Sequence, residues 1–338
     1  MKKSCFKTVE PFATKILFCI VSIICVGLLA CACQNELSIV SPRIQATELQ
    51  SGTASSTVDS QITGTADPTN GKWLRFTAYN GGTSSVLLTN DDGIRAPGLR
   101  ALYAALREAG HTVWVVAPMR QQSGVGHSLT VFEPVRSMDI VEPDFTGTGI
   151  FGTPTDCVKL ALGRLLPERP DMVISGINAG PNVGPDILYS GTVGAATEAA
   201  HEDLPSMAVS HDLNGGPTVD PLPQARHAVA LAERVDWARL GHRRVLNVNY
   251  PARPLDAALG LRVCVQTSAV WKNTYLERKD PRGAPYWWLE GEIPPETIEP
   301  QSDKDLLSQG YITLTPLCFE FTDRQGLQAL ESMNLDAR

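Results

Sequence analysis

The sequence predicts an α/β fold: an open, mostly parallel sheet with helices on both faces. The first observation behind this is a set of short apolar runs, as expected of strands buried on both sides. The second is that these runs alternate with segments whose apolar residues recur at helical spacing, the order typical of parallel strands joined by crossover helices. The 338 residues, of which 43% are hydrophobic and 19% charged, are enough for two domains or for one large α/β domain with additional segments.

The individual elements follow from these runs. Strands are predicted over residues 85–89, 111–116, 172–174, 207–209 and 244–249. Helices are predicted over residues 99–106, 153–165, 192–201 and 226–235. Gly110 is expected to end the first helix, and the Thr153-Pro154 pair to begin the second. The arrangement is Rossmann-like.

The pattern changes after Pro251. Strands are predicted over residues 261–271, 286–290 and 311–317, and helices over residues 302–309 and 323–333. The second half therefore carries strand-rich additions to the sheet. Trp271, Trp287 and Trp288 are interpreted as core or subunit contacts.

The charge and the cysteines exclude several classes of protein. A net charge of −7 is unsuited to non-specific nucleic-acid binding, which depends on Lys and Arg, although one phosphate group could still bind at a metal. Five of the eight cysteines lie within the first 33 residues. The other three, Cys157, Cys264 and Cys318, are too widely spaced for a disulfide framework and are expected to be buried free thiols.

Residues 1–33 have the pattern of a secretory signal: four lysines precede an apolar run over residues 16–30. The run ends Leu28-Leu29-Ala30-Cys31, which resembles the lipobox of bacterial lipoproteins. This predicts lipidation at Cys31, with Cys33 as a second candidate, and a membrane-anchored, extracytoplasmic protein held by acyl chains alone. The alternative is an uncleaved helix extending through Cys33. If the leader is not used, we expect a cytoplasmic protein.

Residues 34–83 are predicted to be a flexible linker. The stretch over residues 51–71 is rich in Ser, Thr and Gly and has no apolar periodicity. The body is therefore expected over residues 84–338, in which residues 252–338 would serve oligomerisation.

Polar side chains follow the early strands, where open α/β sheets bind their ligands. They are Asn90, Asp91 and Asp92 after the first strand; Ser123, His127 and Ser128 after the second; and Ser175, Asn178, Asn182, Ser190, Gly191 and Thr192 after the third. Two carboxylates with a hydroxyl and a carboxamide suit a hard cation such as Mg²⁺ or Mn²⁺. A helix that opens at residues 190–192 would bind an anion through its free N–H groups. Together these features predict hydrolysis of a phosphate ester.

Motifs of several rival functions are absent. No GxGxxG motif follows the first strand, and the sequence contains no GxxxxGK[ST], GxSxG or HExxH motif. A dinucleotide-dependent oxidoreductase, a P-loop protein, an α/β-hydrolase and a zincin are therefore disfavoured.

Four longer motifs carry a family resemblance. They are LLTNDDGIRAPG (residues 87–98), VVAP followed by QSGVGHSLT (115–130), GTPTDCVKLAL (152–162) and SGINAGPNVGPDILYSGTVGAATEA (175–199). Over residues 84–317 the chain resembles the SurE family of stationary-phase survival proteins, which are metal-dependent 5′(3′)-nucleotidases. Met119 departs from the acidic residue that is common after VVAP in that family.

The resemblance implies a site and an assembly. It assigns one divalent cation per subunit to Asp91, Asp92, Ser123 and Asn178. It assigns phosphate and substrate contacts to Asn90, Asn182, Ser190, Gly191 and Thr192. It also implies a homodimer or homotetramer in which a C-terminal segment is exchanged between subunits.

The resulting hypothesis is a divalent-metal phosphomonoesterase that hydrolyses nucleoside 5′- and 3′-monophosphates by metal-activated water. Asp91 and Asp92 are its catalytic carboxylates, and direct attack by Asp91 is the mechanistic alternative. His127 is either a general acid for the leaving alkoxide or a structural loop histidine. His201 and His211 are interpreted as structural. The alternative function is a non-catalytic surface lipoprotein that binds a phosphorylated ligand.

Overall fold

The computed structural model describes residues 83–213, 220–333 and 335, all of which belong to one compact unit, Ile62–Arg338. The predicted signal segment, Cys31 and nearly all of the linker lie outside these residues. In the described part of the chain no helix is both long enough and apolar enough to cross a membrane.

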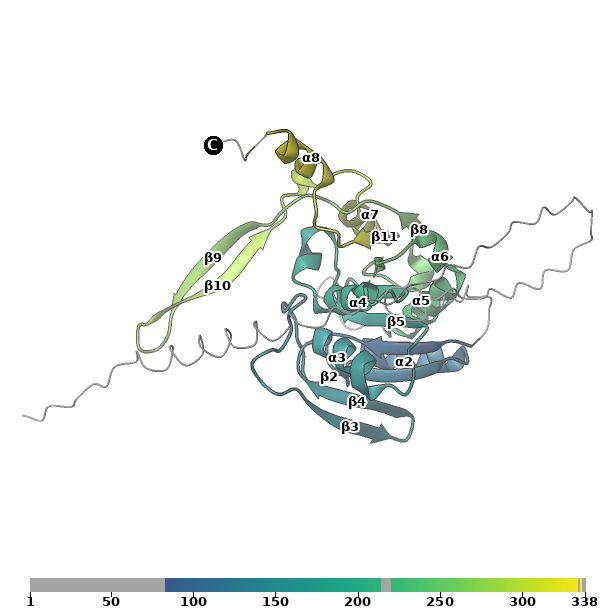
Figure 1. The fold of residues 1–338 in the computed structure, drawn as a ribbon. Helices are drawn as coiled ribbons and strands as arrows, with labels where there is room; N and C mark the ends of the chain where they lie inside the picture. The colour runs from purple at the N-terminus through teal and green to yellow at the C-terminus, as the bar shows by residue number, and fades with distance from the viewer. Residues whose placement is uncertain (1–82, 214–219, 334, 336–338) are drawn as a thin grey trace, which may run out of the picture. The chain divides into compact units, whose positions relative to one another are not determined.

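A mixed sheet organises the unit (Figure 1). It has nine strands in the order β3-β4-β2-β1-β5-β6-β7-β11-β8. Six consecutive strands of this order are parallel: β4 (Phe145–Phe151), β2 (Thr112–Pro118), β1 (Ser85–Thr89), β5 (Met172–Ala179), β6 (Ser206–His211) and β7 (Arg244–Tyr250). Two strands pair antiparallel with these: β3 (Arg136–Glu142) with β4, and β11 (Ile312–Cys318) with β7. The short β8 (Leu261–Val263) is parallel to β11. The predicted α/β class with a mostly parallel sheet is confirmed.

The side chains of β1 alternate between the two faces of the sheet. Since those on both faces are apolar, helices cover both faces. Val86 and Leu88 belong to one apolar cluster with α2 (Pro97–Glu108) and α5 (Leu222–Arg234). Leu87 belongs to another with α3 (Pro154–Leu160) and α4 (Gly191–His201). All three strand side chains are fully buried, so the core lies on both sides of the sheet.

Local sequence signals set the ends of these helices. Pro97 begins α2, whose buried face includes Leu99, Leu102 and Leu106, and Gly110 follows it with a φ of +87°. Thr153 and Asp156 form a capping box at the start of α3. The predicted second helix is α-helical only as far as Leu160 and continues as a π-helical turn, Ala161–Leu165.

The remaining elements lie towards the C-terminus. They are α6 (Trp237–Leu240), β9 (Lys272–Lys279), β10 (Pro285–Glu292), α7 (Asp303–Gln309) and α8 (Arg324–Ser332). β9 and β10 form a separate two-stranded antiparallel sheet (Figure 1). Ser302 caps α7 and Asp323 caps α8, which agrees with the predicted helices.

Three sequence expectations hold only in part. The strand predicted over residues 261–271 ends at Val263: beyond it Val265 pairs with Ser302, and Thr267 and Ser268 bond to the Glu299 carboxylate, so the chain leaves β11. The three tryptophans do not belong to the core, since Trp271 is 41% exposed, Trp287 57% and Trp288 58%, so of the two interpretations only subunit contact remains open. Of the three cysteines, all free, only Cys157 is buried; Cys264 is half-buried and Cys318 is exposed.

Candidate active site

The loop after β1 is held by the side chain of Asn90. This fully buried side chain accepts a hydrogen bond from the Gly93 N–H (3.2 Å) and donates one to the Gly93 carbonyl (3.0 Å). Gly93 has a φ of +103°, a conformation that favours glycine. The closed loop fixes Asp91 and Asp92 at the carboxyl end of β1.

Asp91 is a buried carboxylate, 3% exposed, and it lies at the first turn of α4. Its Oδ1 accepts a hydrogen bond from the Thr192 hydroxyl. Burial raises the pKa of Asp91 to about 6, and nearby Asp92 adds to this rise, whereas the bond from Thr192 opposes it. A Cβ atom at Gly191 would lie 2.8 Å from the Asp91 Cβ, so the close approach of helix and carboxylate requires glycine there.

Asp92 lies against the end of β5. Its Oδ2 accepts the Ala179 N–H at 3.0 Å, and burial raises the pKa of Asp92. The adjacent Asn178 donates its Nδ2 to the Gly180 carbonyl at 2.9 Å, which directs its amide nitrogen to the backbone and leaves Oδ1 as an acceptor. Asp92 and Asn178 line one pocket of about 240 Å³, together with Gln121 and His211.

Ser123 belongs to the β2–β3 loop (residues 119–135), which is tied to the loop after β1. The Gln122 N–H donates to the Asp91 carbonyl at 2.7 Å. Ser123 is exposed, and its hydroxyl accepts a hydrogen bond from the Gln121 side chain at 3.0 Å. The structure thus brings the end of β1, the end of β5 and this loop to the same edge of the sheet.

The donor set and its electrostatics fit a hard divalent cation. Asp91 and Asp92 take part in none of the ion pairs found among the described residues. Two neighbouring carboxylates with raised pKa values lack a countercharge, which a cation would supply. The available oxygens of Ser123 and Asn178 complete a set without nitrogen or sulfur, as Mg²⁺ or Mn²⁺ prefers.

The other predicted substrate residues already have partners within the chain. Ser190 caps α4 by accepting the Val193 N–H at 3.1 Å. Asn182 is 6% exposed, and its Nδ2 donates to the Ser210 hydroxyl at 2.7 Å. Asn90, Asn182 and Ser190 therefore shape the loops around the site, whereas Gly191 and Thr192 lie directly beside Asp91. Their assignment to substrate stays a prediction.

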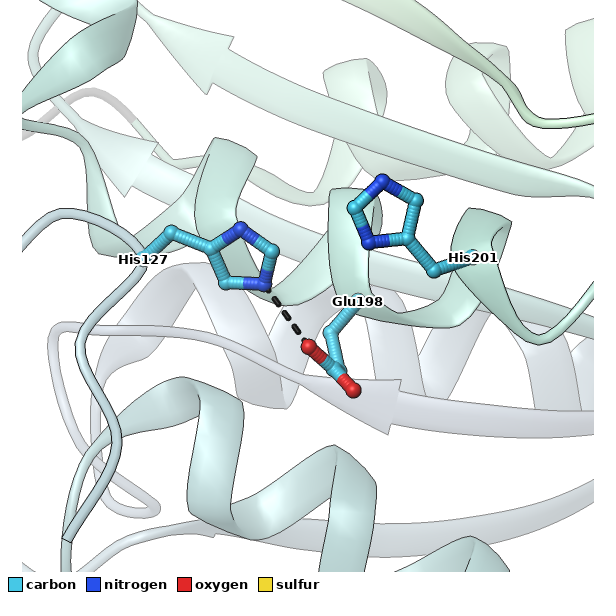
Figure 2. Close-up of side chains that lie close together, drawn as sticks. All are labelled: His127, Glu198 and His201. Carbon is cyan, nitrogen blue, oxygen red and sulfur yellow. Dashed lines mark hydrogen bonds and ion pairs between the residues drawn. The ribbon is translucent and has the colours of Figure 1, made fainter. Parts of the chain in front are cut away.

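His127 pairs with a residue that the sequence did not indicate. Its Nε2 lies 2.8 Å from Oε2 of Glu198 on α4 (Figure 2). Lys159 donates to Oε1 of the same carboxylate at 2.7 Å. These bonds, that of His127 first, lower the pKa of Glu198 to about 2. Because Glu198 lies seven residues after Gly191, the pair is about 10 Å along α4 from the Asp91 end. The predicted role of His127 as an acid is not tested by this geometry.

Gln121 and Glu198 are residues near the site that the sequence did not indicate, and His211, interpreted from the sequence as structural, lines the pocket with Asp92 and Asn178. The only signal for Glu198 was a lone carboxylate in a helix of small residues. His211 is 2% exposed, and its Nε2 has no hydrogen-bond partner within the described residues.

Comparisons with known proteins show which proteins this chain resembles in sequence and fold. Residues 86–273 match the model of a family described as "Survival protein SurE". The chain is 78% identical over 254 residues to "5′-nucleotidase SurE" of Desulfovibrio desulfuricans, covering 74% of this chain and 99% of that protein. It is 56% identical over 251 residues to the protein of the same name from Nitratidesulfovibrio vulgaris, covering 74% and 93%. The crystal structure of the SurE protein from Aquifex aeolicus superposes with a TM-score of 0.63 at 36% identity, covering 74% of this chain and 99% of that one.

Proposed function

The chain belongs to the SurE family, and on this basis we propose that it is a 5′-nucleotidase. It is a divalent-metal-dependent phosphomonoesterase that converts nucleoside monophosphates to nucleoside and phosphate. The 5′-esters follow from the names of its relatives, and we extend the proposal to 3′-esters.

One observation carries this proposal: two neighbouring carboxylates lack a countercharge, and one of them, Asp91, lies beside the first turn of a helix. Carboxylates attract a cation, whereas a helix N-terminus attracts an anion through its free N–H groups. A phosphate ester bound together with a divalent cation satisfies both requirements at one edge of the sheet.

We propose that Asp91, Asp92, Ser123 and Asn178 hold one Mg²⁺ or Mn²⁺ per subunit. When bound, such a cation polarises a phosphoryl oxygen and lowers the pKa of water. The first turn of α4, at Gly191 and Thr192, faces the charge that grows on the phosphoryl oxygens. Thr192 also orients Asp91 through its hydroxyl.

The remaining assignments are supported by position alone. Asn90, Asn182 and Ser190 shape the loops that would enclose the phosphate. We propose His127 as the group that protonates the leaving alkoxide, with its imidazole oriented by Glu198.

The experiment measures phosphate release from AMP by the full chain in Mg²⁺, in Mn²⁺ and in excess EDTA. We expect release with metal, none with EDTA, and a loss of at least about 1,000-fold in kcat for Asp91→Asn and Asp92→Asn, since each removes a charge from the reacting centre. Asp139→Asn is the matched control, because Asp139 is an exposed carboxylate on the edge strand β3. AMP binding without turnover by the wild-type chain would support the ligand-binding lipoprotein instead.

We propose a homodimer or homotetramer that uses residues 252–338. The apolar side chains of the β9–β10 hairpin support this, because Tyr275, Trp287, Trp288 and Leu289 are each more than half exposed. Their area suits burial against a second copy of the chain.

We also propose that the mature protein is a lipoprotein anchored through Cys31 on the extracytoplasmic side of a membrane. The support is the sequence Leu28-Leu29-Ala30-Cys31, which lies outside the described residues. Mass spectrometry of the mature N-terminus tests it: a diacylglyceryl-modified Cys31 is expected, and an unmodified Met1 contradicts it.

A further inference from the structure

Three side chains of the kinds that can bind a metal gather at α4, away from its Asp91 end: two belong to the helix and one to a loop that packs on it. One ligand atom from each of His127, Glu198 and His201 lies within 4.8 Å of the other two, and the His127 and His201 ring centroids are 5.8 Å apart (Figure 2). Glu198 and His201 share one face of the helix because they are three residues apart. His127 reaches them from the β2–β3 loop.

The backbone brings this loop onto the helix. A Cβ atom at Gly194 would lie 2.8 Å from the Gly126 carbonyl oxygen and 3.1 Å from the His127 Cα, so the absence of a side chain at Gly194 allows the contact. Gly126 also donates its N–H to the Tyr189 carbonyl at 2.9 Å. His127 is therefore held over α4 by main-chain contacts as well as by its ring.

The chemistry of the cluster differs from that of the carboxylate site. Two imidazoles and one carboxylate form a ligand set that Zn²⁺ takes with its fourth position open, and Co²⁺ and Ni²⁺ also bind imidazole well. Ligand atoms around a tetrahedral zinc lie about 3.3 Å apart, given bonds of about 2.0–2.1 Å. The three ligand atoms lie within 4.8 Å of one another, and the exposed His201 ring has room to move towards the closer spacing.

We propose that His127, Glu198 and His201 form a second metal site, for Zn²⁺ and similar nitrogen-preferring ions, which clamps the β2–β3 loop to α4. Glu198 binds the ion through Oε2, while Lys159 keeps Oε1 and orients the carboxylate. The site lies about 10 Å along the helix from Gly191, too far for a two-metal centre with Asp91, whose ions would be about 4 Å apart. Because the ion would also occupy His127, it would act on the reaction both through that imidazole, the proposed proton donor, and through the loop that carries Ser123.

The test is calorimetric titration of the tag-free full chain with Zn²⁺ in saturating Mg²⁺, comparing wild type with His201→Asn. We expect the variant to lose one Zn²⁺ site, with affinity lowered at least about 100-fold, since even outer-shell partners are worth 10–100-fold. The rate of Mg²⁺-dependent hydrolysis by His201→Asn should stay within about twofold of wild type. Zn²⁺ should raise the melting temperature of the wild-type chain but not that of the variant. His242→Asn is the matched control, because His242 and His201 line the same pocket but His242 is not part of the proposed site. This control variant should bind Zn²⁺ as the wild type does.

Lys159→Gln separates a metal site from an ion-pair network. Glutamine can still donate to Oε1 and orient the carboxylate, so removal of the ammonium charge alone should tighten Zn²⁺ binding, because that charge no longer repels the metal. Equal Zn²⁺ stoichiometry and affinity in wild type and His201→Asn would overturn the proposal. Asp92→Asn should keep the Zn²⁺ site while losing hydrolysis. Failure of the nucleotidase proposal can therefore be distinguished from failure of the Zn²⁺ proposal.

Discussion

At Asp91 the function conflicts with the stability of the fold. The carboxylate is 3% exposed and has no cationic partner among the described residues, so burial makes its ionised form costly. The shift of its pKa from 3.8 to about 6 corresponds to about 3 kcal/mol between the two protonation states. A cation bound at the proposed site would offset this cost.

The pH dependence of stability follows from the sign of that shift. The pKa of folded Asp91 lies above its unfolded value, so its protonation stabilises the fold below pH 3.8, and this contribution is lost as the pH rises through 6. In excess EDTA, Asp91→Asn should therefore gain stability relative to wild type by up to about 3 kcal/mol between pH 4 and pH 7.5.

Urea unfolding followed by circular dichroism measures this difference. Asp139→Asn, at an exposed position, should show no such trend, and Mg²⁺ should restore the wild type at pH 7.5. A difference between Asp91→Asn and wild type that stays constant across this pH range would mean that Asp91 carries no buried charge.

The sequence predicted residues whose chemistry is local. Asp91, Asp92 and Ser190 follow strands or precede a helix, so position alone places them at the sheet edge. Glu198 and Gln121 were not predicted, because their roles depend on which side chain lies opposite. His127 meets Glu198 across 71 residues of chain, a contact with no signature in spacing.

At the scale of elements, α2 packs against β5 through a glycine. A Cβ atom at Gly98 would lie 2.1 Å from the Ile177 carbonyl oxygen, a backbone atom next to Asn178. The helix therefore rests on the strand end that carries part of the proposed metal site.

Gly98→Ala should consequently destabilise the chain by about 1–3 kcal/mol, in spite of alanine's higher helix propensity, because α2 must move away from β5. Gly163→Ala is the matched control, since a Cβ atom there meets nothing within 4 Å. It should be neutral or slightly stabilising in the same urea unfolding experiment. Equal stability of the two variants would mean that this contact does not limit the packing of α2.

The sequence predicted elements that bury an apolar face better than it predicted exposed ones. β1 and α2 have clear apolar patterns because each buries a face in the core. The edge strand β3 buries only Ile140, and β9 contains residues such as Lys272, Thr274 and Glu277, all exposed. Such strands are specified by their pairing partners, which a reading of one segment at a time does not include.

At the scale of the molecule, the β9–β10 hairpin carries apolar surface that the described part of the chain does not cover. Trp288 pairs with Leu276 and Leu289 with Tyr275 across the two strands, so large side chains occupy both faces of the ribbon. A two-stranded ribbon alone is marginally stable in water, and its burial against another copy would stabilise it. The hairpin is therefore the element on which the proposed assembly would depend.

The double variant Trp287→Ser/Trp288→Ser should lower the mass of the particle, measured by light scattering after size-exclusion chromatography, from that of an oligomer to that of a monomer. The reason is that two aromatic side chains, each more than half exposed in the single chain, supply much of the apolar area available for contact. Phe132→Ser is the control, since Phe132 is 99% exposed but belongs to the β2–β3 loop. A wild-type chain that runs as a monomer, or a double variant that keeps the oligomeric mass, would show that the hairpin does not hold the assembly together.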